Sequence, residues 1–339
     1  MLYHIYMIKS LRIDILKKFM LKLSVFLLGF SYMLGHAYSK PINIIPSIQK
    51  SSNYASVVLD TNTGKVLFSR NAYEQRYPAS LTKMMTLYLT FDALKRKKLY
   101  PLQKLTVSKK AAQQPKSNIN LKVGQKITVR QAIHAVIVKS ANDATITLSE
   151  AAAGDTNKFV ILMNKVTKRL KMKNTRFKNP HGLHNEGQYT TAADMAKLSS
   201  ALKRDFPRYY HLFSMRSFMY RGKEIKGHNM VLNRYEWADG LKTGYTDASG
   251  FNLATSTKNP SGNLVAVVMG GQTARIRDDH MIKLLDNAYA KLGVHKKTVK
   301  TSVFAKAHTS LGTGVFQYAG NTSPKNHKDK FCWDALDIH

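Results

Sequence analysis

The stretch Pro78-Ala79-Ser80-Leu81-Thr82-Lys83-Met84 joins a β-like part of the sequence to a helical part. After it, apolar residues recur at helical spacing as far as Leu94 with no internal proline, which predicts that Ser80 lies at the start of a helix. A lysine one helical turn after a serine projects onto the same face and, when neutral, can take the hydroxyl proton. Ser80 and Lys83 are therefore candidates for a nucleophile and its base.

The Ser-x-x-Lys spacing is weak evidence when it stands alone. The same spacing occurs in Ser47-Ile48-Gln49-Lys50 and in Ser200-Ala201-Leu202-Lys203. A neutral Lys83 also requires a pKa below the usual value of about 10.4, through burial or through a nearby cation. Lys242 is a candidate for that cation.

The patterns on both sides of this stretch predict the fold. Upstream, the β-like runs 55–60 and 65–68 flank an Asn/Gly turn, which predicts a hairpin. Downstream, helical patterns come first, and β-like runs return before a closing helix. Because β-like runs stand at both ends, we expect an α/β (α+β) fold: an antiparallel sheet, completed by both ends of the domain and flanked by helices, with a helical subdomain beside it. The other predicted elements are helices 81–94, 129–138, 143–153, 157–170, 191–202 and 278–292, and strands 240–245, 251–256 and 264–269.

Two further motifs follow the first in order. Ser140-Ala141-Asn142 lies in the predicted connection between two helices, and Lys242-Thr243-Gly244 occurs once in the chain. Ser140 and Asn142 could simply cap a helix, and Lys242-Thr243-Gly244 could be an ordinary edge strand. The ordered set of Ser-x-x-Lys, Ser-x-Asn and Lys-Thr-Gly, however, is typical of penicillin-binding proteins and class A β-lactamases.

With these residues the sequence resembles the D-alanyl-D-alanine carboxypeptidases among the low-molecular-mass penicillin-binding proteins, which are serine peptidases. The resemblance covers about residues 50–292. It includes Lys139-Ser140-Ala141-Asn142-Asp143-Ala144, Asn179-Pro180-His181-Gly182-Leu183 and Gly240-Leu241-Lys242-Thr243-Gly244-Tyr245-Thr246. It implies a β-lactamase/transpeptidase-like fold, and β-lactam antibiotics as covalent inhibitors.

The resemblance also implies roles for the motif residues. Ser80 would attack the amide between the two terminal D-alanines of a peptidoglycan stem peptide, Lys83 would take its proton, and water would hydrolyse the resulting ester. Ser140 would relay a proton to the leaving amine. The expected substrate-binding residues are Asn142, Lys242, Thr243 and Gly244. The expected oxyanion hole consists of the backbone N–H groups of Ser80 and Tyr245.

The last three substrate-binding residues suit particular tasks. A lysine and a hydroxyl at 242 and 243 fit recognition of a terminal carboxylate. A glycine at 244 would let the substrate approach the strand closely.

Other functions remain open at this point. A peptidoglycan DD-endopeptidase shares the same motifs and differs in the shape of the cleft. A β-lactamase is less favoured, because no segment resembling Glu-x-x-Leu-Asn lies between Asn142 and Lys242. A basic cell-wall-binding protein with a decayed site would be expected to lose at least one motif residue, yet all are present.

The two ends of the chain carry different patterns. Lysines precede the apolar run Leu23 to Leu34, which ends in small residues, so residues 1–39 are expected to be a signal peptide, or an uncleaved anchor. The catalytic domain is predicted to span 40–295, and residues 296–339 form a basic polar tail of unknown fold. We therefore expect an exported protein, in the periplasm or on the cell-wall face of the bacterial cytoplasmic membrane.

The composition narrows the partners. The net charge of +33 falls to +29 without residues 1–39, because these hold five Lys or Arg and one Asp. An exported cation of this size meets anionic wall polymers or membrane surfaces, and no nucleic-acid-binding motif accompanies the charge. Cys332 is the only cysteine, which rules out an intramolecular disulfide. His181 and His184 lack convergent ligands in the sequence, so we expect no metal and no cofactor.

Overall fold

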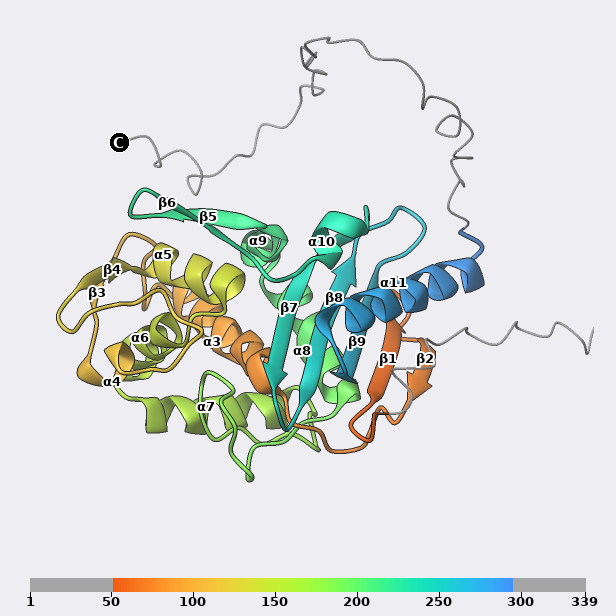
Figure 1. The fold of residues 1–339 in the computed structure, drawn as a ribbon, viewed down its shortest axis with the longest axis horizontal. Coiled ribbons are helices and arrows are strands. Elements are labelled where there is room, and N and C mark those ends of the chain that lie inside the picture. Colours follow the sequence, from red (N-terminus) through yellow and green to blue (C-terminus); the bar gives the residue numbers. More distant parts are fainter. Residues whose placement is uncertain (1–50, 295–339) are drawn as a thin grey trace, which may run out of the picture. The chain divides into compact units, whose positions relative to one another are not determined.

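A five-stranded antiparallel sheet is the centre of the computed structural model, which describes residues 51–294 (Figure 1). The predicted signal peptide and tail lie outside the described residues. The strand order is β2-β1-β9-β8-β7. These strands are β1 (Ala55–Asp60), β2 (Val66–Arg70), β7 (Ala238–Thr246), β8 (Gly250–Thr257) and β9 (Leu264–Gly271). The predicted hairpin β1–β2 pairs with β9, so both ends of the domain complete the sheet as the sequence predicts.

Helices cover both faces of this sheet. The closing helix α11 (Ala274–Lys291) and the short α10 (Val231–Arg234) pack on one face, where Val58, Leu253 and Leu285 belong to a common apolar core. Helix α8 (Ala192–Asp205) contacts β1, β8 and β9 on the other face (Figure 1). Every residue of β9 is buried, which explains why its sequence is continuously apolar and does not alternate.

A helical region lies beside the sheet. It is built around α3 (Lys83–Lys95), against which α6 (Asn142–Ala153) and α7 (Thr156–Arg169) pack. The short 3₁₀ turn η1 (Ala79–Thr82) leads into α3, so Ser80 occupies the turn immediately before that helix. Helix α3 is buried almost all round, as expected of a helix between other elements.

The connection before α6 has an unusual backbone. Helix α5 (Val129–His134) begins with a Thr128–Gln131 capping box and continues as one π-helical segment, η2 (Ala135–Lys139). Ser140 follows in the left-handed conformation with φ 60° and ψ 33°, a region that costs energy for a residue other than glycine. Asn142 is the first residue of α6, so the predicted connection of residues 140–142 is one residue shorter than expected.

Several short elements were not predicted. They are the hairpin β3 (Lys104–Thr106) with β4 (Lys126–Thr128), the hairpin β5 (Ser217–Tyr220) with β6 (Lys223–Lys226), and the short helices α4 (Lys109–Ala112), α9 (Pro207–Tyr210) and η3 (His211–Ser214). Helix α11 begins at Ala274, four residues before the predicted start at 278, because Thr273 caps it through a hydrogen bond from the backbone N–H of Ile276. Within residues 51–294, no helix has the length and apolar character needed to cross a membrane.

Candidate active site

A cleft of about 420 Å³ opens between the sheet and the helical region. All three sequence motifs contribute to its lining, through Ser80 from η1, Ser140 and Asn142 from the start of α6, and Thr243 and Gly244 from β7. The remaining lining residues are Lys116, Ser117, His181, Gly182, Leu183, His228, Tyr245, Thr246, Phe251, Ala274 and Arg277. The fold therefore brings together residues that are far apart in the sequence.

Ser80 and Lys83 form a hydrogen-bonded pair. The Lys83 Nζ atom lies 2.9 Å from Ser80 Oγ, because η1 and α3 place the two side chains one turn apart on one face. Lys83 Nζ also donates to the carbonyl oxygen of His181 at 2.6 Å. The carbonyl thus takes one N–H and orients the amine toward Ser80.

The environment of Lys83 favours the neutral amine. Lys83 is completely buried, and this burial is the main reason why its pKa is well below the usual value; the nearby Lys242 lowers it further, while Asp143 opposes both effects. The predicted contribution of Lys242 to the lowered pKa of Lys83 is thus confirmed in direction. A buried neutral amine next to a hydroxyl is chemically able to act as a base.

The loop Asn179-Pro180-His181-Gly182-Leu183 forms the floor beside this pair. Asn179 organises it, since its side chain accepts a hydrogen bond from the Gly182 N–H and donates one to Leu183 O. Gly182 has φ +89°, and a Cβ atom there would lie 1.9 Å from the carbonyl oxygen of Ala79. Only glycine permits this contact with the residue preceding Ser80.

The His181 ring is buried in the same loop. Its Nδ1 accepts a hydrogen bond from the Leu183 N–H, which helps to hold the loop, as the sequence suggested for this histidine. Burial, then the positive charges of Lys83 and Lys110, lower the pKa of His181 to about 3. Its ring is therefore neutral at physiological pH.

Ser140 and Asn142 stand on the helical side of the cleft. The hydroxyl of Ser140 is buried and has no hydrogen-bond partner within the described part of the chain, so it is available to a bound molecule. The Asn142 side chain donates to Pro115 O at 3.0 Å, and its backbone N–H donates to Ser117 O at 2.7 Å. Neither residue makes a side-chain cap of α6, so capping does not explain their presence.

Lys242 and Thr243 lie on β7, facing the cleft from the sheet side. Lys242 is buried, and its Nζ donates to the carbonyl oxygen of Thr243 at 2.9 Å. Burial and the neighbouring Arg277 lower the pKa of Lys242 to about 7. Near neutral pH this lysine is consequently divided between its charged and neutral forms.

Gly244 approaches the nucleophile itself. A Cβ atom at this position would lie 3.0 Å from the backbone N of Ser80 and 3.2 Å from that of Leu81. The sequence suggested that glycine here makes room for substrate; the structure shows that it lets β7 approach the turn carrying Ser80. The next residue, Tyr245, lines the cleft and packs its ring on Phe251 with centroids 4.2 Å apart.

Arg277 is a site residue that the sequence interpretation missed. It is buried on α11, where its guanidinium donates two hydrogen bonds to Asp278 and one to Asn252 O. A signal was present: position 277 falls on the same helical stripe as Met281, Leu284 and Ala288, so an arginine there interrupts an apolar face. His228 and Lys116 were also missed, because each lies in a loop without periodicity.

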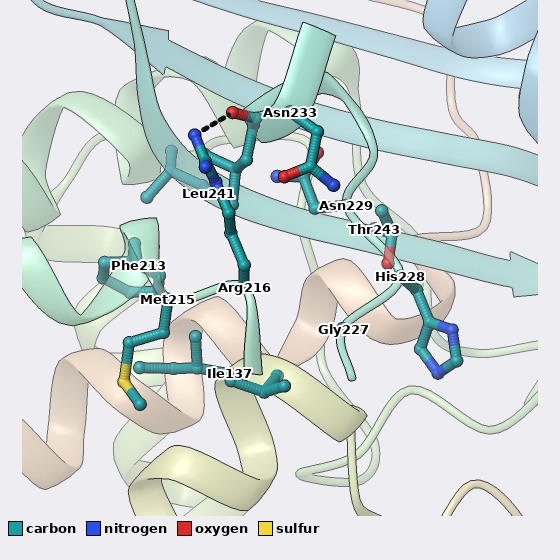
Figure 2. A pocket seen from close by; sticks show the side chains of 12 residues that line it. Ile137, Phe213, Met215, Arg216, Gly227, His228, Asn229, Asn233, Leu241 and Thr243 are labelled. Carbon is teal, nitrogen blue, oxygen red and sulfur yellow. Dashed lines mark hydrogen bonds between the residues drawn. The ribbon is translucent and has the colours of Figure 1, made fainter. Parts of the chain in front are cut away.

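A second, small pocket lies behind Thr243 (Figure 2). Thr243 and His228 line both this pocket and the cleft. In Figure 2 the His228 ring points away from the other labelled side chains, while Arg216 donates to the backbone oxygen of Leu232 at 2.8 Å. Both polar side-chain atoms of Asn229 are buried here without a partner among the described residues.

No group of three His, Cys, Asp or Glu side chains in the described part of the chain is arranged to hold a metal ion. The chemistry available in the cleft is that of a serine hydroxyl, a neutral amine and several hydrogen-bond donors.

Comparison with known proteins agrees with this arrangement. Residues 43–273 match the model of the peptidase S11 family, described as D-alanyl-D-alanine carboxypeptidase. The chain is 35% identical over 262 residues to D-alanyl-D-alanine carboxypeptidase DacA of Escherichia coli K12, a match that covers 74% of this chain and 65% of that protein. This chain therefore spans less than two thirds of that relative's length.

Other relatives extend the comparison. The crystal structure of penicillin binding protein 5 from Haemophilus influenzae superposes with a TM-score of 0.68 at 35% identity, covering 70% of each chain. A D-alanyl-D-alanine endopeptidase of Pseudomonas aeruginosa is 30% identical over 250 residues, covering 69% of this chain and 77% of that protein. The fold is that of penicillin-binding proteins, and the chain belongs to the peptidase S11 family of D-alanyl-D-alanine carboxypeptidases.

Proposed function

We propose that this protein is a serine-type D-alanyl-D-alanine carboxypeptidase that removes the terminal D-alanine from peptidoglycan stem pentapeptides. The observation that carries the proposal is the hydrogen bond between Ser80 Oγ and the buried Lys83 amine at the edge of a cleft lined by the other two motifs. Family membership and the similarity to DacA support the choice of substrate.

The acylation step follows from the geometry. Ser80 Oγ attacks the carbonyl carbon of the penultimate D-alanine while its proton passes to Lys83 Nζ. The backbone N–H groups of Ser80 and Tyr245 stabilise the oxyanion, and the position of Ser80 before α3 adds the favourable end of a helix dipole. The C–N bond then breaks, and the leaving amine takes a proton through Ser140, whose hydroxyl has no other partner in the described residues.

Deacylation returns the enzyme to its starting state. A water molecule attacks the ester on Ser80, its proton is taken by the same base, and the shortened peptide leaves. Asn142 holds the peptide backbone, and Lys242 and Thr243 hold the terminal carboxylate through charge and a hydroxyl donor. Gly244 allows β7 to lie close enough for these contacts.

A fluorescent penicillin tests the nucleophile. We expect covalent labelling of the purified protein and its complete loss in Ser80→Ala, because the acyl-enzyme forms on that hydroxyl. Ser200→Ala is the matched control: it removes a serine of the same Ser-x-x-Lys spacing, but Lys203 is engaged by Asp239 and Thr257 O. Labelling that persists in Ser80→Ala would contradict the assignment.

The main alternative is a DD-endopeptidase, which the similarity to the Pseudomonas enzyme favours. Adding a stem pentapeptide and a cross-linked muropeptide separately, and measuring released D-alanine and cleaved cross-link by mass, separates the two activities. Release of D-alanine is expected; cross-link cleavage without it would establish the alternative.

The surroundings of the enzyme belong to the same proposal. A protein acting on stem peptides works outside the cytoplasm, in agreement with the export signal expected in residues 1–39. β-Lactam antibiotics are proposed as covalent inhibitors, and anionic wall or membrane surfaces as partners of a chain with a net charge of +33.

A further inference from the structure

The charge of the cleft lining is unusual for a site that binds a peptide with one terminal carboxylate. None of the lining residues within the described chain is acidic, whereas Lys116, His228 and Arg277 are basic. Arg277 and the buried Lys242 lie on the sheet side, next to Thr243, where the terminal carboxylate is proposed to bind. Lys116 belongs to the other, helical side.

The structure holds Lys116 at this place. The residues on both sides of it are hydrogen-bonded to Asn142: the side chain of Asn142 donates to Pro115 O, and its backbone N–H donates to Ser117 O. Ser117 Oγ donates further to Lys139 O at 2.7 Å. The backbone of Lys116 is therefore fixed beside the amide proposed to hold the acyl part of the substrate.

The ammonium group of Lys116 has no partner within the protein. The described residues offer it neither an ion pair nor a hydrogen bond, and its side chain is exposed at the cleft. By contrast, Arg277 is paired with Asp278, and Lys203 with Asp239. An unpaired cation fixed at the edge of a substrate cleft is free to pair with an anionic group of the substrate.

We propose that Lys116 recognises a second carboxylate of the stem peptide, on the side chain of the residue preceding the two D-alanines. The substrate class is thus a peptide whose third residue from the C-terminus is a dicarboxylic amino acid with its side-chain carboxylate free, in preference to one with that group amidated or absent. This inference rests on the proposed function, because it takes the terminal carboxylate to lie at Thr243. Lys116 on this account determines specificity and takes no part in the bond-breaking steps.

Two synthetic tripeptides test the proposal. Both are N-acetylated and end in D-Ala-D-Ala; the first residue is 2-aminopimelic acid with a free side-chain carboxylate in one and its side-chain amide in the other. For the unmodified protein we expect a value of kcat/KM about fivefold higher for the acid, the size of one partly exposed ion pair. In Lys116→Gln the two peptides should become equivalent, through loss of rate with the acid alone, and Lys116→Arg should keep the preference.

The matched control is Lys122→Gln, which removes the same charge from an exposed lysine that does not line the cleft. It should keep the preference, since only the general field of the protein changes. Equal rates for the two peptides in the unmodified protein, or a preference that survives Lys116→Gln, would overturn the proposal.

A second readout separates this proposal from the proposed function. Each tripeptide is added as a competitor of fluorescent penicillin, and the slowing of labelling is measured without any need for turnover. If neither peptide is hydrolysed but the acid competes better and Lys116→Gln removes the difference, the carboxypeptidase assignment fails and the role of Lys116 stands. Release of D-alanine without discrimination gives the reverse result.

Discussion

Lys83 combines two hydrogen bonds with complete burial, and this combination gives the residue its chemistry. An ammonium group donates to both Ser80 Oγ and His181 O, whereas a neutral amine has two N–H groups and one lone pair. When the amine is neutral and one N–H stays on His181 O, its lone pair is free to accept from the Ser80 hydroxyl. The direction of the Ser80–Lys83 hydrogen bond thus reverses on deprotonation, which prepares the proton transfer of acylation.

The charge of Lys242 is expected to set part of the pH dependence. If Lys83 must be neutral, acylation is lost as pH falls through its pKa, which burial and the charge of Lys242 lower. Lys242→Gln removes this repulsion, so the acid limb of the rate of penicillin acylation should move to higher pH. Lys242→Arg, which keeps the charge, should leave the limb nearly in place even where the maximal rate falls; an unmoved limb in Lys242→Gln would show that the coupling is absent.

At the scale of elements, the site depends on contacts between a loop and a turn that neither could make alone. The loop of residues 179–183 supplies His181 O to Lys83 and also Pro180 O, which accepts from Thr86 at 2.6 Å. Gly182 packs on Ala79, which itself has φ 47°. The nucleophile is consequently held by the loop from one side and by β7 from the other.

Gly182→Ala tests this contact. The added methyl group meets Ala79 O, so we expect a loss of at least ~3 kcal/mol in the free energy of unfolding. The rate of penicillin acylation should fall as well, because the turn carrying Ser80 must move. Gly154→Ala is the control: its φ of +85° is similar, but nothing lies within 4 Å of the new atom, so it should cost only about 1 kcal/mol. Equal losses in urea unfolding and unchanged acylation would show that the contact is unimportant.

How far the sequence predicts these elements depends on where their information lies. The long amphipathic helices and the strands of the sheet were predicted, because periodicity records which face is buried. The π-helical turn 135–139 was not, since Ala-Val-Ile-Val-Lys suits several backbones and its geometry is imposed by packing. The hairpin 217–226 was missed because it is short and mostly polar on one strand.

The same distinction applies to the candidate site. The three motifs predicted residues that do line one cleft or lie directly behind it, whereas their chemical roles stay predictions. Lys116 and His228 enter the cleft only through loop conformations that no local pattern records. Arg277 was detectable as a charge on an apolar stripe, but its position opposite Ser80 depends on the packing of α11 on the sheet.

For the molecule as a whole, burying two amines in one site has a cost in stability that depends on pH. The folded-state pKa of Lys83 lies below its value of 10.5 in the unfolded chain, so the unfolded state binds more protons between those two values. Stability therefore rises with pH through this window, and the penalty is greatest below the folded pKa. Lys242, with a pKa of about 7, contributes in the same direction.

Lys83→Met isolates the first of these contributions. We expect the unmodified protein to gain stability relative to Lys83→Met as pH is raised from 7 toward 10, because only the unmodified protein has this lysine to protonate on unfolding. Urea titrations at several pH values measure the difference between the two free energies of unfolding. A difference that does not change with pH would mean that Lys83 keeps its proton in the folded state.

The sheet completed by both ends of the domain has a consequence for the timing of activity. Ser80 follows the first hairpin, whereas Arg277 lies on α11, and β1 pairs with β9 across most of the described sequence. Such non-local pairings form late and slowly during folding, after local helices. The cleft cannot assemble before the last strand has been added, so a chain that has just been released should not react with penicillin until folding is nearly complete, and the appearance of label reports that moment.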